Sequence, residues 1–120
     1  PLQRWEQIAE QTDGFVFVLP EYNHGYPGEW KQLVDALTKP FHGKPATVVG
    51  VSKGIFSGAR VIEHVKPVLI ELGLVAVSTA LYFGNVADRF DEEGNLTDGA
   101  QRERLDAFVA HFIEDVEKTL

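Results

Sequence analysis

Hydrophobic positions along the chain follow two patterns, and the first is a continuous apolar run. Such runs occupy residues 15–19 (FVFVL), 46–52 (ATVVGVS) and 74–83 (LVAVSTALYF), the last broken near Ser78 and Thr79. A strand with one face in water would alternate apolar and polar residues. We therefore predict three strands that are covered on both faces, as the strands of a parallel sheet are.

The second pattern is the three-to-four residue spacing of an amphipathic helix. Gly73 lies where a glycine commonly ends a helix, and Asp98 with Gln101 forms a capping pair before the last helix. The pattern predicts four helices, with buried faces that carry Leu2, Trp5, Ile8 and Ala9; Trp30, Leu33, Val34 and Leu37; Val61, Ile62, Val65, Val68, Leu69 and Leu72; and Leu105, Phe108, Val109, Phe112, Ile113 and Val116.

Helices and strands alternate along the sequence, with one long polar loop before the last helix. Regular alternation predicts an α/β fold around a parallel sheet with right-handed crossover connections. The length of 120 residues is that of one domain, so we expect a single domain over residues 1–120.

Two loops that follow predicted strands carry more polar and aromatic groups than a connection needs. In an open α/β sheet, ligands bind at the carboxyl ends of the strands, and the loops over residues 20–28 and 52–58 leave such ends. If the two strands are neighbours, their loops share one ligand. The candidate binding residues are Pro20, Glu21, Tyr22, Asn23 and His24 in the first loop and Ser52, Gly54, Ser57 and Gly58 in the second.

These residue types suit a flat heteroaromatic ring with a hydrogen-bonding rim better than a compact phosphate. The first loop offers flat side chains, and the second offers hydroxyls and backbone N–H groups near a helix start. A purely structural interpretation is also open, in which the loops only turn the chain and Ser57 caps a helix. His24 is either a surface residue or a group on the substrate side that could transfer a proton, and Lys53 is expected to be solvated.

Composition and charge exclude several classes of function. The net charge of −7 argues against a nucleic-acid partner, which usually requires a basic face. The absence of cysteine excludes disulfides and thiolate metal sites, and His42, His64 and His111 lack metal-ligand spacing. No apolar run approaches the roughly 20 residues of a membrane span, and the polar start shows no signal peptide. We expect a cytoplasmic protein with no membrane partner.

The stretch DRFDEEGNLTD invites comparison with a calcium-binding EF-hand loop. If Gly94 takes the sixth position, Arg89 and Ala100 fall at the first and twelfth, where carboxylates are required. A solvated acidic loop is therefore the better interpretation, and no metal site is expected.

Both candidate loops resemble the NADPH-dependent FMN reductase family of the flavodoxin-like fold. PEYNHGYPGEWKQLVDAL is similar to that family's pattern P-E-Y-N-x-x-x-P-G-x-L-K-N-x-[IL]-D, with Trp30 and Gln32 as departures on the helix. VSKGIFSGAR resembles its second flavin loop, S-x-G-x-x-G-G-x-R, with Ser57 in place of a common glycine. The resemblance continues through the last strand and the acidic segment to the final helix.

The resemblance implies a cofactor and a reaction. It implies FMN held at the nine candidate residues, reduced by NAD(P)H, with electrons passed on to a free flavin, a quinone, an azo compound or a similar small-molecule acceptor. The cofactor then carries the chemistry, which is consistent with the absence of a nucleophile–base pair. We also expect a homodimer or tetramer built on the helix that carries Trp30, because tryptophan is enriched at subunit interfaces.

The family pattern begins with a strand, a phosphate-binding loop, a helix and a second strand that this sequence does not contain. We expect a three-layer flavodoxin-like fold without its first two strands, and so an incomplete domain in which the first strand here has a bare edge. FMN would bind weakly to these residues alone. The alternative is a cofactor-free flavodoxin-like fragment that acts as an interaction or scaffold module.

Overall fold

The computed structural model describes residues 1–120 and contains the predicted elements in the predicted order. They are α1 (Leu2–Gln11), β1 (Phe15–Pro20), α2 (Gly28–Asp35), β2 (Pro45–Val51), α3 (Ala59–Glu71), β3 (Val75–Ala76), β4 (Leu81–Phe83), a short 3-10 helix η1 (Val86–Arg89) and α4 (Gly99–Glu117).

All strand pairings in the sheet are parallel, as predicted. β2 is central: β1 pairs with it from Phe15↔Ala46 to Pro20↔Val51, and β3 and β4 both pair with its other side. The predicted third strand is thus split into β3 and β4, with the break where the sequence placed it. β1 pairs with no other strand, so its outer edge is bare in this chain.

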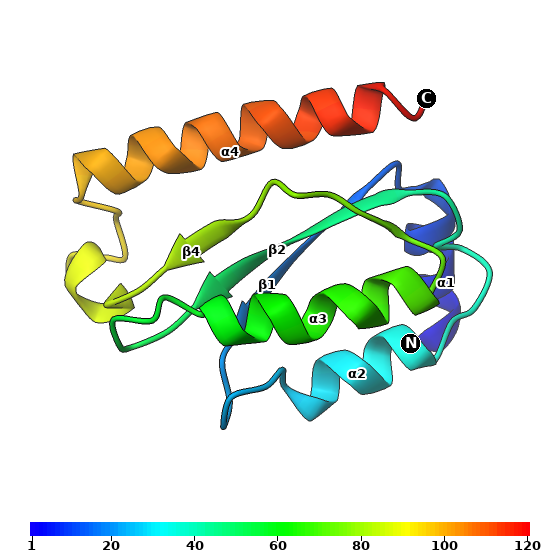
Figure 1. Ribbon diagram of the computed structural model, residues 1–120, viewed down its shortest axis with the longest axis horizontal. Helices are drawn as coiled ribbons and strands as arrows, with labels where there is room; N and C mark the ends of the chain where they lie inside the picture. The colour runs from blue at the N-terminus through cyan, green and yellow to red at the C-terminus, as the bar shows by residue number, and fades with distance from the viewer.

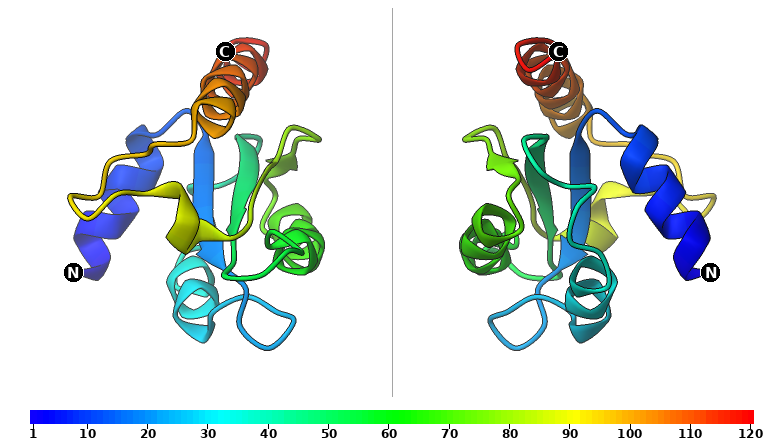
Figure 2. Two further views of the ribbon diagram at one scale, coloured as in Figure 1. Left: turned by 90° about the vertical axis from the view of Figure 1, so that its left-hand side faces the viewer. Right: turned by 90° about the vertical axis from the view of Figure 1, so that its right-hand side faces the viewer.

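The elements form three layers (Figure 1), with α2 and α3 on one side of the sheet and α4 on the other. Figure 2 shows α1 beside β1, where Trp5 packs against Phe15 and Phe41. The larger apolar core lies between the sheet, α2 and α3, and a smaller one joins Val49, Leu81, Phe83 and Phe108 under α4.

The prediction that β1 is covered on both faces is wrong. Val16 and Val18 are 40% and 63% exposed, whereas β2 is buried at every position except partly exposed Val51. The physical reason is that α4 packs over β2 and β4, leaving the same face of β1 without a covering helix. Of the strands predicted from continuous apolar runs, only the central strand β2 is covered on both faces along most of its length.

Several predicted helix-face residues are also exposed, while others form the core as expected. Leu2, Ile8 and Leu33 are about half exposed, and so are Val109 and Ile113 of α4. The Trp30 side chain is buried against the rings of Phe17 and Tyr26. Because Trp30 belongs to the core, its indole is not available to another subunit.

The predicted glycine end of α3 is confirmed, whereas the predicted capping pair of α4 is only half formed, because the buried Gln101 Oε1 has no hydrogen-bond partner. Gly73 has a φ of +82°, and the N–H groups of Gly73 and Leu74 donate to the carbonyls of Ile70 and Leu69, which is the Schellman pattern. Asp98 accepts a hydrogen bond from the Gln101 N–H at the start of α4. No helix combines the length and the apolar character needed to cross a lipid bilayer.

Candidate functional site

The two candidate loops lie side by side because β1 and β2 are parallel neighbours. Pro20 and Val51 form the last residue pair of the two strands, so both loops leave the same edge of the sheet. The Glu21 N–H donates to the Val51 carbonyl at 3.2 Å and ties the start of the first loop to β2. The two loops therefore lie together at one edge of a parallel sheet, as the alternation of helices and strands predicts.

The first loop is built around a tight turn. Tyr22 and Gly25 exchange two backbone hydrogen bonds of 2.9 Å, and Asn23 and His24 between them have φ values of +50° and +69°. Two consecutive positive φ angles define a type I′ turn, which favours asparagine first and glycine second. Asn23 therefore suits its backbone position, whereas His24 is held in a left-handed conformation that costs free energy.

The second loop is held by the segment that follows β4. The Ser52 N–H donates to the Phe83 carbonyl, and the N–H groups of Asn85 and Val86 donate back to the carbonyls of Gly54 and Ser52. The backbone N–H groups of residues 53–58 donate no hydrogen bond within the protein. Residues 53–56 of this segment are exposed, so their N–H groups are open to a polar ligand at this edge.

Between the loops lies a cavity of about 460 Å³, within the range of roughly 300–1,000 Å³ typical of small-molecule sites. Both apolar and polar side chains line this cavity. It is lined by Pro20, Glu21, Tyr22, Val51, Ser52, Lys53 and Val86. This lining fits a planar ring with a polar rim.

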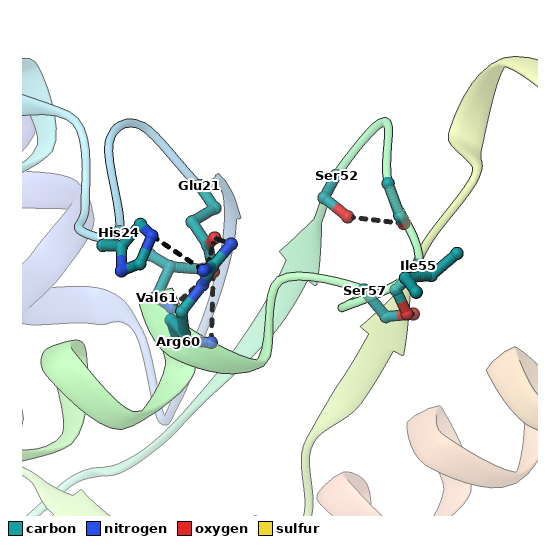
Figure 3. Close-up of polar contacts among 8 residues, drawn as sticks. Glu21, His24, Ser52, Ile55, Ser57, Arg60 and Val61 are labelled. Atoms are coloured by element: carbon teal, nitrogen blue, oxygen red, sulfur yellow. Dashed lines mark hydrogen bonds and ion pairs between the residues drawn. The ribbon is translucent and has the colours of Figure 1, made fainter.

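A buried carboxylate joins the first loop to the start of α3 (Figure 3). Glu21 Oε2 lies 2.7 Å from Arg60 Nε and 2.6 Å from Nη2, and Oε1 accepts the backbone N–H groups of Arg60 and Val61. The hydrogen bond from Arg60 is the largest influence and lowers the pKa of Glu21, with the N–H of Val61 acting in the same direction and burial opposing them. Glu21 thus caps α3 from the first loop.

The expected cap of α3 by Ser57 is wrong. The Ser57 hydroxyl donates to the Ile55 carbonyl, and the residue at the cap position, Gly58, has no side chain to contribute. Gly58 has a φ of +74°, and a Cβ there would lie 2.6 Å from the Gly50 carbonyl carbon. The close approach of two backbones requires glycine at this position, and Glu21 supplies the missing cap.

The cavity collects four of the nine candidate residues. Pro20, Glu21, Tyr22 and Ser52 line it, whereas Asn23, His24, Gly54, Ser57 and Gly58 shape the loops around it. His24 faces the start of α3 instead, with its Nε2 2.8 Å from Arg60 Nη1. Because a guanidinium only donates, His24 Nε2 accepts in this contact.

Sequence reasoning missed other parts of the site. Val51 was assigned to its strand, Arg60 was not singled out, and Val86 was assigned to a polar loop. Lys53 is exposed, as expected, and also lines the cavity. Arg60 lay inside the quoted second motif, so that motif offered a signal; nothing marked Val86. No group of three or more His, Asp or Glu side chains lies close enough together to hold a metal ion.

Comparison with known proteins assigns this fold and these loops to one family. Residues 1–88 match the family described as NADPH-dependent FMN reductase. The chain is 33% identical over 121 residues to a quinone reductase of Pseudomonas putida, covering 93% of this chain and 64% of that relative. It is 31% identical over 122 residues to a quinone reductase of Escherichia coli K12, covering 94% and 65%.

A solved structure is similar as well. The flavoenzyme NAD(P)H:(acceptor) oxidoreductase FerB from Paracoccus denitrificans has a TM-score of 0.89 and 31% identity, covering 98% of this chain and 68% of that one. The chain belongs to the NADPH-dependent FMN reductase family and has its flavodoxin-like fold. It spans slightly less than two thirds of the length of the curated quinone reductases that it matches.

Proposed function

We propose that this chain supplies the flavin-ring site of an NAD(P)H-dependent oxidoreductase that reduces a small planar acceptor through FMN. The observation that carries the proposal is the cavity between the two loops, with apolar walls on both sides and free backbone donors beside it. Membership of the FMN reductase family supports the choice of FMN over other flat cofactors.

Each part of the site has a role toward the ring. Pro20 and Tyr22 form one wall, and Val51 and Val86 form an apolar floor that excludes water. The N–H groups of residues 53–58 are the donors for the polar rim. FMN, when bound, supplies the capacity to take electrons from a nicotinamide and pass them to an acceptor.

A quinone or a second flavin is the acceptor class that we propose, with azo compounds as a further possibility of similar shape. Relatives named quinone reductase and, in Burkholderia sp., 2-hydroxy-1,4-benzoquinone reductase support a quinone. The cavity is partly open and its mouth is flanked by the exposed ring of Tyr22. A flat acceptor could therefore approach a bound ring from solvent.

The proposal is tested by titrating the 120-residue chain with FMN up to millimolar concentration, then following quinone-dependent NADH and NADPH oxidation. We expect saturable binding with quenched flavin fluorescence, and nicotinamide oxidation that requires the protein, FMN and the quinone together. A chain that changes no flavin signal at any concentration would favour the scaffold function instead.

The two residues of the turn should differ from a surface residue in their effect on flavin binding. We expect Tyr22→Ala and Asn23→Ala each to weaken binding of oxidised FMN about fivefold, or about 1 kcal/mol. The first removes a cavity wall, and the second puts a Cβ residue without a stabilising amide at a positive φ. Lys39→Ala, an exposed residue before β2, is the control, and equal affinity in all three variants would contradict the ring assignment.

A homodimer or tetramer remains part of the proposal, with its contact surface moved away from Trp30. Ile55 and Phe56, adjacent at the tip of the second loop, are 78% and 62% exposed, so they offer an apolar surface that a second subunit could cover. We expect light scattering at micromolar concentration to give at least twice the monomer mass, and Phe56→Ser to lower it. A monomeric wild-type chain would remove this part of the proposal.

A further inference from the structure

Lys53 is a free cation at the cavity between the two loops. It lines the cavity together with Tyr22 and Ser52, and its ammonium group makes no ion pair or hydrogen bond within the protein. The chain as a whole is acidic, with a net charge of −7. Because Lys53 is exposed and unpaired, its ammonium group is available to an anionic group of a ligand bound in the cavity.

The other charges at this cavity neutralise each other. Glu21 is the acidic residue of the lining, and its carboxylate is held at 2.6–2.7 Å by the guanidinium of Arg60. The Glu21 side chain is only 7% exposed, and both of its carboxylate oxygens are occupied by Arg60 and the start of α3. The net charge that a bound ring would experience from the lining is therefore the positive charge of Lys53.

A flavin ring changes its charge when it is reduced. The neutral oxidised ring takes up two electrons and one proton, both supplied by the reduced nicotinamide, and becomes a monoanion near neutral pH. A fixed cation beside the ring interacts weakly with the neutral form and favourably with the anion. A differential interaction of this kind shifts the equilibrium between the two forms, whereas equal binding of both would not.

We propose that Lys53 stabilises the reduced, anionic flavin ring and raises its reduction potential, while contributing little to binding of the oxidised ring. This inference rests on the proposed function, because it requires that the cavity holds FMN. It extends that function by assigning a tuning role to a side chain that the loop pattern leaves variable.

The competing role for Lys53 is attachment of a phosphate, either that of FMN itself or that of the nicotinamide cofactor. Contact with a phosphate would contribute equally to oxidised and reduced FMN, because the phosphate charge does not change on reduction. It would also contribute nothing to riboflavin, which has the same ring and no phosphate. The ratio of affinities for the two redox states therefore separates the two roles.

The experiment is an anaerobic titration of the 120-residue chain with oxidised and with dithionite-reduced flavin, using both FMN and riboflavin. The variants are Lys53→Gln, Lys53→Arg and Lys39→Gln. Lys39 lies in the connection that precedes β2, at the opposite end of the sheet, so Lys39→Gln makes the same change in net charge away from the cavity.

We expect Lys53→Gln to weaken binding of the reduced ring by about three- to tenfold relative to the oxidised ring, in FMN and riboflavin alike. A tenfold change in this ratio corresponds to a potential about 30 mV lower for a two-electron couple. Because Lys53 is exposed, the effect should shrink as salt is added. Lys53→Arg and Lys39→Gln should keep the wild-type ratio.

Each other result overturns the proposal. An unchanged ratio in Lys53→Gln removes the tuning role while leaving the proposed function intact, and so does an equal loss for both redox states of FMN. If Lys39→Gln lowered the ratio of reduced to oxidised flavin affinity as much as Lys53→Gln does, the cause would be the net charge of the protein and not the position of Lys53. A wild-type chain that binds neither form at millimolar flavin would overturn this inference together with the proposed function.

Discussion

Gly58→Ala is expected to destabilise the folded chain by about 2–5 kcal/mol. The φ of +74° at Gly58 is a conformation in which a Cβ costs roughly 1–2 kcal/mol. The new Cβ would also lie 2.6–2.8 Å from three backbone atoms of Gly50 and Val51 in the central strand. Backbone atoms of a paired strand cannot move aside as a flexible side chain does, so overpacking adds a further 1–3 kcal/mol or so.

The matched control lies in the same loop. A Cβ at Gly54 would meet no atom within 4 Å, and its φ lies outside the left-handed region, so Gly54→Ala should change stability by less than about 0.5 kcal/mol. Urea denaturation followed by tryptophan fluorescence measures both variants. A Gly58→Ala midpoint equal to that of Gly54→Ala would show that α3 can move away from β2.

The glycines of the second loop show how far the sequence could define the site. The family pattern selected Gly54 and Gly58 together as cofactor-binding residues. The structure separates them, since Gly54 is open and accepts hydrogen bonds from Ser52 and Asn85, while Gly58 is fixed by packing against Gly50. A sequence pattern records that a glycine is required but not which contact requires it.

The fold was predictable because its signals are local, and the site was only partly so. Apolar runs and helical spacing defined each element, and the rule of parallel neighbours placed the two loops together without any knowledge of contacts. The coverage of β1 could not be predicted in this way, because exposure of Val18 depends on where α4 lies. Contacts between distant segments, such as that of Val86 with the second loop, leave no periodic signal.

The Glu21–Arg60 pair is the clearest case of a contact that sequence patterns did not reveal. The two residues are 39 positions apart, and each belonged to a different motif. Glu21 was assigned to the ring site, and the structure shows that its carboxylate is occupied by α3 and Arg60. Its acceptor capacity is used to hold the first loop against the start of α3, and only its position at the cavity wall is open to a ligand.

Glu21→Gln is expected to destabilise the chain by about 2 kcal/mol at pH 7. Glutamine keeps one acceptor oxygen, but its NH₂ group replaces the other. Because an NH₂ group cannot accept, either the N–H groups at the start of α3 or the Arg60 guanidinium loses its hydrogen-bond acceptor. Leaving a buried donor unsatisfied costs roughly 1–3 kcal/mol. We expect a loss of folding free energy near the middle of that range, because the Arg60 side chain is 39% exposed and water can solvate it.

The difference between wild type and Glu21→Gln should depend on pH. Hydrogen bonds from Arg60 hold the pKa of Glu21 below its usual range, so the folded state binds its proton less readily than the unfolded state. The stability that this carboxylate provides is then complete above the unfolded pKa of about 4.3 and is lost as pH falls through the lower folded value. Urea midpoints measured from pH 7 to pH 3 should converge for the two proteins.

The control for this prediction is another glutamate on the helix that Glu21 caps. Glu63 pairs with Lys66 one turn away at 2.8 Å, and its side chain is 63% exposed, so Glu63→Gln should change stability by less than about 0.5 kcal/mol. A gap between wild type and Glu21→Gln that stays constant down to pH 3 would contradict the role of the charge. Since the same carboxylate ties the first loop to the start of α3, Glu21→Gln should also speed amide exchange in residues 22–25 more than in β2. That result would link the stability of this contact to the shape of the cavity wall that Glu21 and Tyr22 form.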